Sequence, residues 1–189
     1  MDSLTDLKLV RQIKSGNHWA FEELVKKYQK KIFYICYRMT RDLDAADDIA
    51  QETFIRVYQS IANFKEKYQF HSWLYRICTN LCINYLRRQK FLVRESDVDD
   101  FEQFVESHAV MDREINSAAE QALLENLRDE IDRLPPDYKA VLILKVYENL
   151  SCEEIAGILK IPLGTVLSRL ARAREKLAQN IRVKKEQRE

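Results

Sequence analysis

Glycine and proline are scarce in this sequence, and that scarcity restricts the fold more than any other feature. The 189 residues include three Gly and three Pro. Sheets built from hairpins need many such residues, because tight turns require positive or fixed φ angles. Hydrophobic residues make up 46% of the chain, which is enough to form a buried core. The sequence therefore predicts a folded, all-α protein made of long helices.

Apolar residues recur with a helical period along most of the chain. Helices are expected at about 3–15, 18–39, 44–63, 72–90, 118–134, 137–148, 152–159 and 164–180. Ser72 is the expected N-cap of the fourth helix, and Ser151 with Glu154 forms an expected capping box before the seventh. The prediction is two small helical domains of about four helices each, at 1–90 and 118–189, joined by an acidic linker at 91–117.

Charge is distributed unevenly, although the net charge is only +1. Residues 1–90 contain sixteen Lys/Arg against ten Asp/Glu, whereas residues 91–117 contain two against eight. Basic regions favour polyanionic partners such as nucleic acids, although ordinary solvated faces are also charged. No apolar run is long enough to insert into a membrane. Four cysteines without a signal sequence lead us to expect reduced thiols in the cytoplasm.

The helix expected at 44–63 has two distinct faces when its residues are spaced by about 100°. Its core face comprises Ala46, Ile49, Ala50, Thr53, Val57, Ile61 and Phe64. A stripe on the opposite side comprises Asp48, Gln51, Glu52, Ile55 and Gln59. An isoleucine surrounded by carboxylates and amides favours docking of a partner helix. A single exposed isoleucine on a solvated face is the ordinary alternative.

The helix expected at 72–90 is also divided. The predicted core face comprises Leu74, Ile77, Cys78, Leu81, Cys82 and Tyr85, and the predicted outer face comprises Trp73, Arg76, Asn80, Ile83, Arg87 and Lys90. Aromatic residues and lysines alternate just upstream, in 63–70. Cations beside aromatic rings are typical of single-stranded nucleic-acid sites. The alternative is that Phe64, Tyr68 and Phe70 simply close the core.

Residues 151–180 are typical of a helix-turn-helix, because two helices flank a short connection at 160–163. In the second helix the expected inner residues are Val166, Leu170, Ala173 and Leu177, and the expected outer residues are Gly164, Ser168, Ala171, Arg172 and Glu175. Small and basic residues suit a helix that enters the major groove of DNA. A solvated basic helix would show the same pattern.

Four segments together resemble a known family: DIAQETFIRVYQSIANF, FHSWLYRICTNLCINYLRR, LPPDYKAVLILK and LSCEEIAGILKIPLGTVLSRLARAREKL. In order and spacing they are similar to the bacterial sigma factors of the extracytoplasmic-function (ECF) group. The resemblance covers nearly the whole chain apart from the linker. It implies a promoter-specificity subunit of RNA polymerase, with sigma region 2 at 1–90 and sigma region 4 at 118–189.

The resemblance also implies roles for particular residues. Residues that would bind the clamp coiled coil of the polymerase's largest subunit are Asp48, Gln51, Glu52 and Ile55. Residues that would open the minus-ten element and hold its non-template strand are Phe64, Lys65, Lys67, Phe70, Trp73, Arg76, Asn80 and Arg87. Residues that would contact the minus-thirty-five element as duplex are Thr165, Ser168, Arg169, Arg172 and Arg174.

Two positions depart from the pattern of related sequences. Leu167 stands where a cation is common, and Ala171 stands where an aromatic residue or His is common. Neither side chain can hydrogen-bond a base, so shape is expected to contribute more to recognition of the minus-thirty-five element. The family further implies an alternative, stress-responsive sigma factor with an anti-sigma partner, and no catalytic residue, cofactor or metal.

Three other functions remain as alternatives. The acidic residues Asp42, Asp44, Asp47 and Asp48 could hold magnesium for phosphoryl transfer, although acids also favour a first helical turn. Cys78 and Cys82, with His18, His71 and His108, could form a metal or redox module, although both cysteines are expected in the core. A DNA-binding regulator that is not a sigma factor would need the helix-turn-helix but not the stripe on the third helix.

Overall fold

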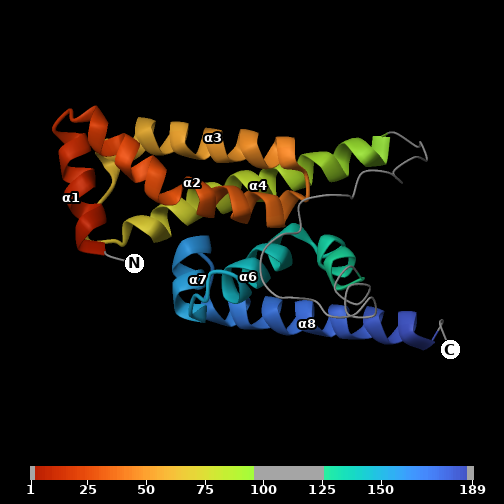
Figure 1. The fold of residues 1–189 in the computed structure, drawn as a ribbon. Helices are drawn as coiled ribbons and strands as arrows, with labels where there is room; N and C mark the ends of the chain where they lie inside the picture. Colours follow the sequence, from red (N-terminus) through yellow and green to blue (C-terminus); the bar gives the residue numbers. More distant parts are fainter. Residues whose placement is uncertain (1–2, 96–125, 187–189) are drawn as a thin grey trace, which may run out of the picture.

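The structure is a computed structural model that describes residues 3–95 and 126–186, and all regular elements in these two ranges are helical (Figure 1). The helices are α1 (Ser3–Lys14), α2 (His18–Thr40), α3 (Leu43–Ser60), a 3-10 turn (Ile61–Asn63), α4 (Phe70–Glu95), α6 (Pro136–Val146), α7 (Cys152–Leu159) and α8 (Leu163–Glu186).

Residues 126–132 are also helical. The all-α prediction is confirmed, and the prediction of a helix at 152–159 matches α7, whose bounds are Cys152–Leu159.

Local sequence explains most of the helix ends. Gly16 adopts a φ of 93° between α1 and α2, a conformation that glycine tolerates without strain. The Asn17 side chain then caps α2 by accepting from the backbone N–H of Trp19. Asp42 caps α3 in the same way, and Ser151 with Glu154 forms both hydrogen bonds of the predicted capping box.

The start of α4 differs from the prediction. Ser72 was expected to be the N-cap, but α4 begins at Phe70, so that Ser72 lies within the first turn. The backbone N–H of Trp73 donates to the carbonyl of Gln69, which extends the helix toward its N-terminus. At the other end α4 continues to Glu95, beyond the expected start of the linker at residue 91. The rest of the predicted linker lies outside the described residues.

Helices α1 to α4 form the first helical group, in which α2 packs on α1, α3 and α4. Asp6 is buried at the contact between α1 and α2, where it accepts hydrogen bonds from Tyr28 Oη and Lys27 Nζ, both at 2.6 Å. Burial and the neighbouring Asp6 carboxylate raise the pKa of Tyr28, so its hydroxyl remains a donor. All residues of the predicted core face of the third helix are buried: Ala46, Ile49, Ala50, Thr53, Val57, Ile61 and Phe64.

Helices α6, α7 and α8 form the second group, and this group packs against α2 and α4 of the first (Figure 1). One hydrophobic core continues through both groups, because buried residues of α2 and α4 belong to the same cluster as Ala140, Ile143 and Ile155. The position of Ile83 reflects this packing. The sequence placed Ile83 on the outer face of α4, but it is only 8% exposed, because α4 is covered on a second side by the other group.

A buried lysine strengthens the contact between the two groups. Lys139 of α6 donates to the carbonyl oxygen of Met39 at 2.8 Å, where the last turn of α2 has free carbonyls, and it pairs with Asp132 at 2.8 Å. Asp132 also accepts from Arg41, which follows α2. Burial lowers the pKa of Lys139, and the Asp132 carboxylate opposes this change.

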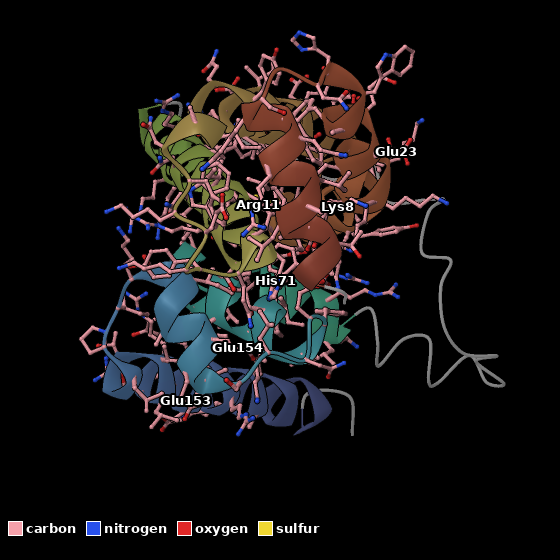
Figure 2. The ribbon with its side chains drawn as sticks, turned by 90° about the vertical axis from the view of Figure 1, so that its left-hand side faces the viewer. Lys8, Arg11, Glu23, His71, Glu153 and Glu154 are labelled. Carbon is pink, nitrogen blue, oxygen red and sulfur yellow. The ribbon has the colours of Figure 1, made fainter. Side chains whose placement is uncertain are left out.

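Glu148, which follows α6, makes a second polar contact across the same boundary. Its carboxylate pairs with Lys31 of α2 at 3.0 Å and accepts from Tyr75 Oη of α4 at 3.2 Å. The Glu148 side chain is 2% exposed, so both contacts form in a largely dehydrated environment. Figure 2 shows His71 of α4 and Glu154 of α7 on the two sides of this boundary. Burial lowers the pKa of His71.

In the part of the chain that the structure describes, no helix combines the length and apolar character needed to cross a membrane.

Replacing Glu148 with Ala tests the contact between the two groups. The change leaves Tyr75 Oη without its acceptor and Lys31 without its carboxylate. We expect the free energy of unfolding to fall by about 1–3 kcal/mol and the radius of gyration to rise. Urea denaturation and small-angle X-ray scattering measure these quantities. Glu23→Ala, which removes an exposed pair with Lys26 within α2, should change neither; an equal effect in both variants would contradict the account.

Candidate functional site

The outer face of α3 carries the predicted docking residues, here called the docking face: Asp48, Gln51, Glu52 and Ile55. Asp48 and Gln51 are exposed, Glu52 is partly exposed and Ile55 is 50% exposed. Two hydrogen bonds on this face stay within α3: Gln51 donates to Asp47, and Arg56 donates to Glu52. Within the described residues, the docking face is therefore open to a partner.

Aromatic residues on α3 and at the start of α2 are also exposed near the docking face, and the sequence did not predict them. Tyr58 follows Ile55 by three residues on α3 and is 44% exposed. Its hydroxyl lies 3.0 Å from His18 Nδ1 at the start of α2, and its ring packs edge-on against Phe21. Trp19, beside His18, is 75% exposed. The sequence signal was the adjacent ring residues His18 and Trp19 in the first turn of α2. Helical period alone does not show which residues they contact.

Helix α1 holds the loop between α3 and α4. Lys14 donates to the carbonyl oxygen of Phe64 at 2.7 Å, and Arg11 pairs with Glu66 at 2.8 Å. The backbone N–H of Tyr68 closes a turn by donating to the carbonyl of Lys65. Lys65 and Lys67 are exposed, as predicted for residues that contact DNA.

The aromatic residues around this loop have different environments. Phe64 and Phe70 are buried, at 4% and 1% exposure, and their rings pack against each other and against the partly buried Trp73. The core-closing alternative therefore holds for Phe64 and Phe70 in this structure, and their contact with DNA stays a prediction. Tyr68 is different, because it is 57% exposed beneath the Lys67 ammonium, which lies 5.0 Å from the ring centre.

The outer face of α4 is partly covered. Asn80 is exposed, and Arg76 is partly exposed. Arg87 is exposed too, but its guanidinium pairs with Asp137 of α6 at 2.8 Å. Arg76 and Asn80 thus lie one helical turn apart on a single face of α4. Arg87 instead forms an ion pair with the second group.

The helix-turn-helix has the predicted geometry. Helix α7 ends at Leu159, its C-cap Lys160 adopts the left-handed conformation with a φ of 52°, and α8 begins at Leu163. The predicted inner residues Val166, Leu170 and Ala173 are buried. The predicted outer residues are exposed, including Gly164, Ser168, Ala171, Arg172 and Glu175.

The residues predicted to contact the minus-thirty-five element lie along α8. Ser168, Arg172 and Arg174 are exposed, and Thr165 is partly exposed. Arg172 also donates to Tyr138 Oη at 3.4 Å. Leu167 is 51% exposed, so this side chain offers an apolar surface where related sequences often carry a cation. Arg169 is the least exposed of the predicted arginines, and it is paired.

One carboxylate holds two of the predicted DNA-binding arginines. Asp137 Oδ2 accepts from Arg87 of α4 at 2.8 Å, while Asp137 Oδ1 lies 3.3 Å from Arg169 of α8. Arginine binds a phosphate and a carboxylate with similar geometry. The Asp137 carboxylate therefore pairs with one arginine from each group of helices, and both arginines are predicted DNA contacts.

The acidic cluster considered for magnesium does not assemble into a site. Asp42 caps α3, while Asp44, Asp47 and Asp48 are exposed in its first turns. Among the described residues, the grouping with ligand atoms close enough for a metal ion is instead made of thiols: Cys36, Cys78 and Cys82. The metal alternative drawn from the sequence included only Cys78 and Cys82 of these thiols, because Cys36 belongs to a different helix.

Comparison with known proteins assigns the two helical groups. Residues 24–91 match the family model described as Sigma-70 region 2, and residues 124–177 match Sigma-70, region 4. The chain is 40% identical to RNA polymerase sigma-H factor of Pseudomonas aeruginosa, over 90% of each protein. It is 37% identical to ECF RNA polymerase sigma factor SigW of Bacillus subtilis, over 93% of this chain and 96% of that protein.

The fold is similar to that of the sigma factor RpoE in its co-crystal structure with the anti-sigma factor NepR from Bartonella quintana. The TM-score is 0.64 at 23% identity, with 86% of this chain and 97% of that chain covered. Both sigma regions and the identity to the curated relatives over most of the chain lead to one assignment. The chain belongs to the ECF sigma factors, which direct RNA polymerase to promoters at transcription initiation.

Proposed function

We propose that this sigma factor binds the clamp coiled coil of the polymerase's largest subunit through the docking face of α3. The observation that carries this proposal is Ile55, which is half exposed and lies among polar side chains that make only local contacts. An apolar centre with a polar rim is the usual composition of a protein interface. Tyr58 and Trp19 add exposed aromatic area, a residue type enriched in such interfaces.

The loop at 64–69 and the adjoining face of α4 are proposed to open the minus-ten element. Lys65 and Lys67 suit the phosphates of the strand, and Tyr68 and Trp73 offer ring surface for an unstacked base. Stacking a base returns about 1–3 kcal/mol, which is comparable to the cost of removing it from the duplex. Phe64 and Phe70 support the indole of Trp73 from beneath.

Helix α8 is proposed to contact the minus-thirty-five element as duplex DNA. Its outer face combines Ser168, Arg172 and Arg174 with the small residues Gly164 and Ala171, which allow close approach to a groove. Leu167 and Ala171 offer no hydrogen bond to a base, so fewer positions of the element are selected directly.

The free chain is proposed to bind promoter DNA weakly, because the two groups of helices are closed on each other. Asp137 neutralises Arg87 and Arg169, and the packing of α6 and α7 on α4 disfavours the separation that the two groups would need to span two promoter elements. Binding to core polymerase would then select a separated arrangement. We further propose that the protein acts in the cytoplasm as an alternative sigma factor under an anti-sigma factor, as the Bartonella relative is bound by one.

The alternatives from the sequence fare differently. Membership in the sigma-factor family is not membership in a family of enzymes, so the magnesium-dependent enzyme is set aside. A DNA-binding regulator that is not a sigma factor would have no use for the exposed docking face on α3. Binding to core polymerase separates that regulator from the proposed function.

Replacing Gln51 and Glu52 together with Ala tests the docking face. We expect affinity for purified core polymerase to fall by at least about tenfold, because the polar rim around Ile55 is lost. Fluorescence anisotropy of the labelled chain measures this affinity. Glu175→Ala with Gln179→Ala has the same composition on α8 and should leave core binding intact. Unchanged binding in the Gln51/Glu52 variant would remove the main support for the proposal.

Replacing Arg76 or Asn80 with Ala tests the outer face of α4. We expect fewer open complexes, measured by permanganate reactivity of unpaired thymines, with normal affinity for core polymerase. Gln89→Ala, which removes an exposed amide from the opposite side of α4, is the matched control. A parallel loss of core binding would show that the face is structural instead.

Replacing Asp137 with Asn tests the shared carboxylate. The variant keeps the side-chain size but releases Arg87 and Arg169, so the isolated full-length chain should bind promoter DNA roughly three- to tenfold more tightly, since each exposed ion pair is worth up to about 1 kcal/mol. A filter-binding assay at fixed salt measures this. Asp129→Asn removes the same charge from an exposed position. An equal gain in that variant would assign the effect to net charge and contradict the role of Asp137.

A further inference from the structure

Three thiols meet in the core of the first helical group. Cys36 comes from α2, and Cys78 and Cys82 come from successive turns of α4. All three side chains are 0% exposed, and their sulfur atoms lie within 4.8 Å of one another. Cys36 Sγ is 3.4 Å from Cys78 Sγ. Cys78 and Cys82 were predicted to lie in the core, but the spacing within α4 could not show that α2 supplies a third thiol.

The separation of these sulfur atoms suits a single metal ion. Thiolates bound at about 2.3 Å to one ion, at the corners of a triangle around it, are about 4 Å apart. The three sulfurs already span this range without movement of either helix backbone. Simple apolar packing also explains buried cysteines one at a time. It does not require three of them to meet at one point from two helices.

The donor set selects the kind of ion. The described residues that form this group are all cysteines, with no His, Asp or Glu among them. Structural zinc is almost always held by four ligands, whereas soft thiolates also suit Cu(I). A closed, fully buried set of three thiolates therefore favours a soft ion of coordination number three over Zn²⁺.

We propose that Cys36, Cys78 and Cys82 form a three-coordinate site for a soft metal ion of the Cu(I) class. On binding, each coordinating thiol loses its proton to solvent as its sulfur–metal bond forms, and no electron is transferred. The ion ties α2 to α4 beneath α6. Because the sulfurs are fully buried, the ion enters when these helices separate, so its exchange from the folded chain is slow.

The experiment uses the full-length chain, reduced and freed of metal under anaerobic conditions. Cu(I) is supplied from a chromogenic chelator that competes for it, and the copper retained per chain is measured after gel filtration. We expect one equivalent, with X-ray absorption showing sulfur neighbours only, three in number. Zn²⁺ supplied in the same way should bind more weakly. Equal or tighter Zn²⁺ binding would contradict the three-coordinate assignment.

Single replacements of Cys36, Cys78 or Cys82 with Ala should each weaken Cu(I) binding by at least about tenfold. Loss of a residue that only hydrogen-bonds a metal ligand already costs about that much, and loss of the ligand itself should cost more. The matched control is Cys152→Ala, because Cys152 is a partly exposed free cysteine outside the cluster. Circular dichroism of the metal-free variants checks that they fold. The sulfur count by X-ray absorption is made on the unaltered chain, so it does not depend on the folding of any variant. Absence of retained copper, an equal loss in Cys152→Ala, or a disulfide among the cluster cysteines without copper would each overturn the proposal.

Discussion

Helix α4 is buried on two sides, and the arrangement of the rest of the chain depends on that burial. One side packs on α2 and α3, and another packs on α6 and α7. Leu74, Tyr75 and Cys78 are almost fully buried within this contact. Each large apolar side chain removed from water contributes roughly 1.5–3 kcal/mol to the free energy of unfolding. A helix that is covered on two sides therefore stabilises both groups. The same helix carries Arg76, Asn80 and Arg87, which ties the proposed DNA contacts to the packing of the two groups.

In the proposed account, this double packing keeps the proposed DNA contacts occupied when the protein is alone. Asp137 occupies an arginine from each group, and Lys139 and Glu148 place buried polar contacts across the boundary. If the closed arrangement dominates in the free chain, the apparent association constant for DNA equals the constant of the open form multiplied by the fraction of open molecules. Core polymerase, by binding the docking face on α3, could shift that population without any change in the DNA contacts themselves.

Features that depend on a single helix were predictable from the sequence. The exposed docking residues and the buried core face of α3 follow from helical period alone, and the capping box at Ser151 follows from local hydrogen bonding. Features that depend on a neighbouring element were not predictable. Ile83 is buried because α6 and α7 cover α4, and Cys36 joins the other thiols because α2 crosses α4. Phe64 and Phe70 carry the same aromatic signal as Tyr68, yet packing with Trp73 buries two of the three.

In the free chain the two groups are proposed to be closed on each other, and core polymerase is proposed to open them. Spin labels placed through non-natural residues at Glu23 of α2 and Glu153 of α7, both exposed and outside the proposed docking and DNA contacts, report the distance between the two groups without using the native cysteines. Pulsed electron–electron spin resonance should give one narrow distance distribution for the free chain and a longer distance with core polymerase bound. A broad distribution in the free chain, unchanged by core polymerase, would contradict the account.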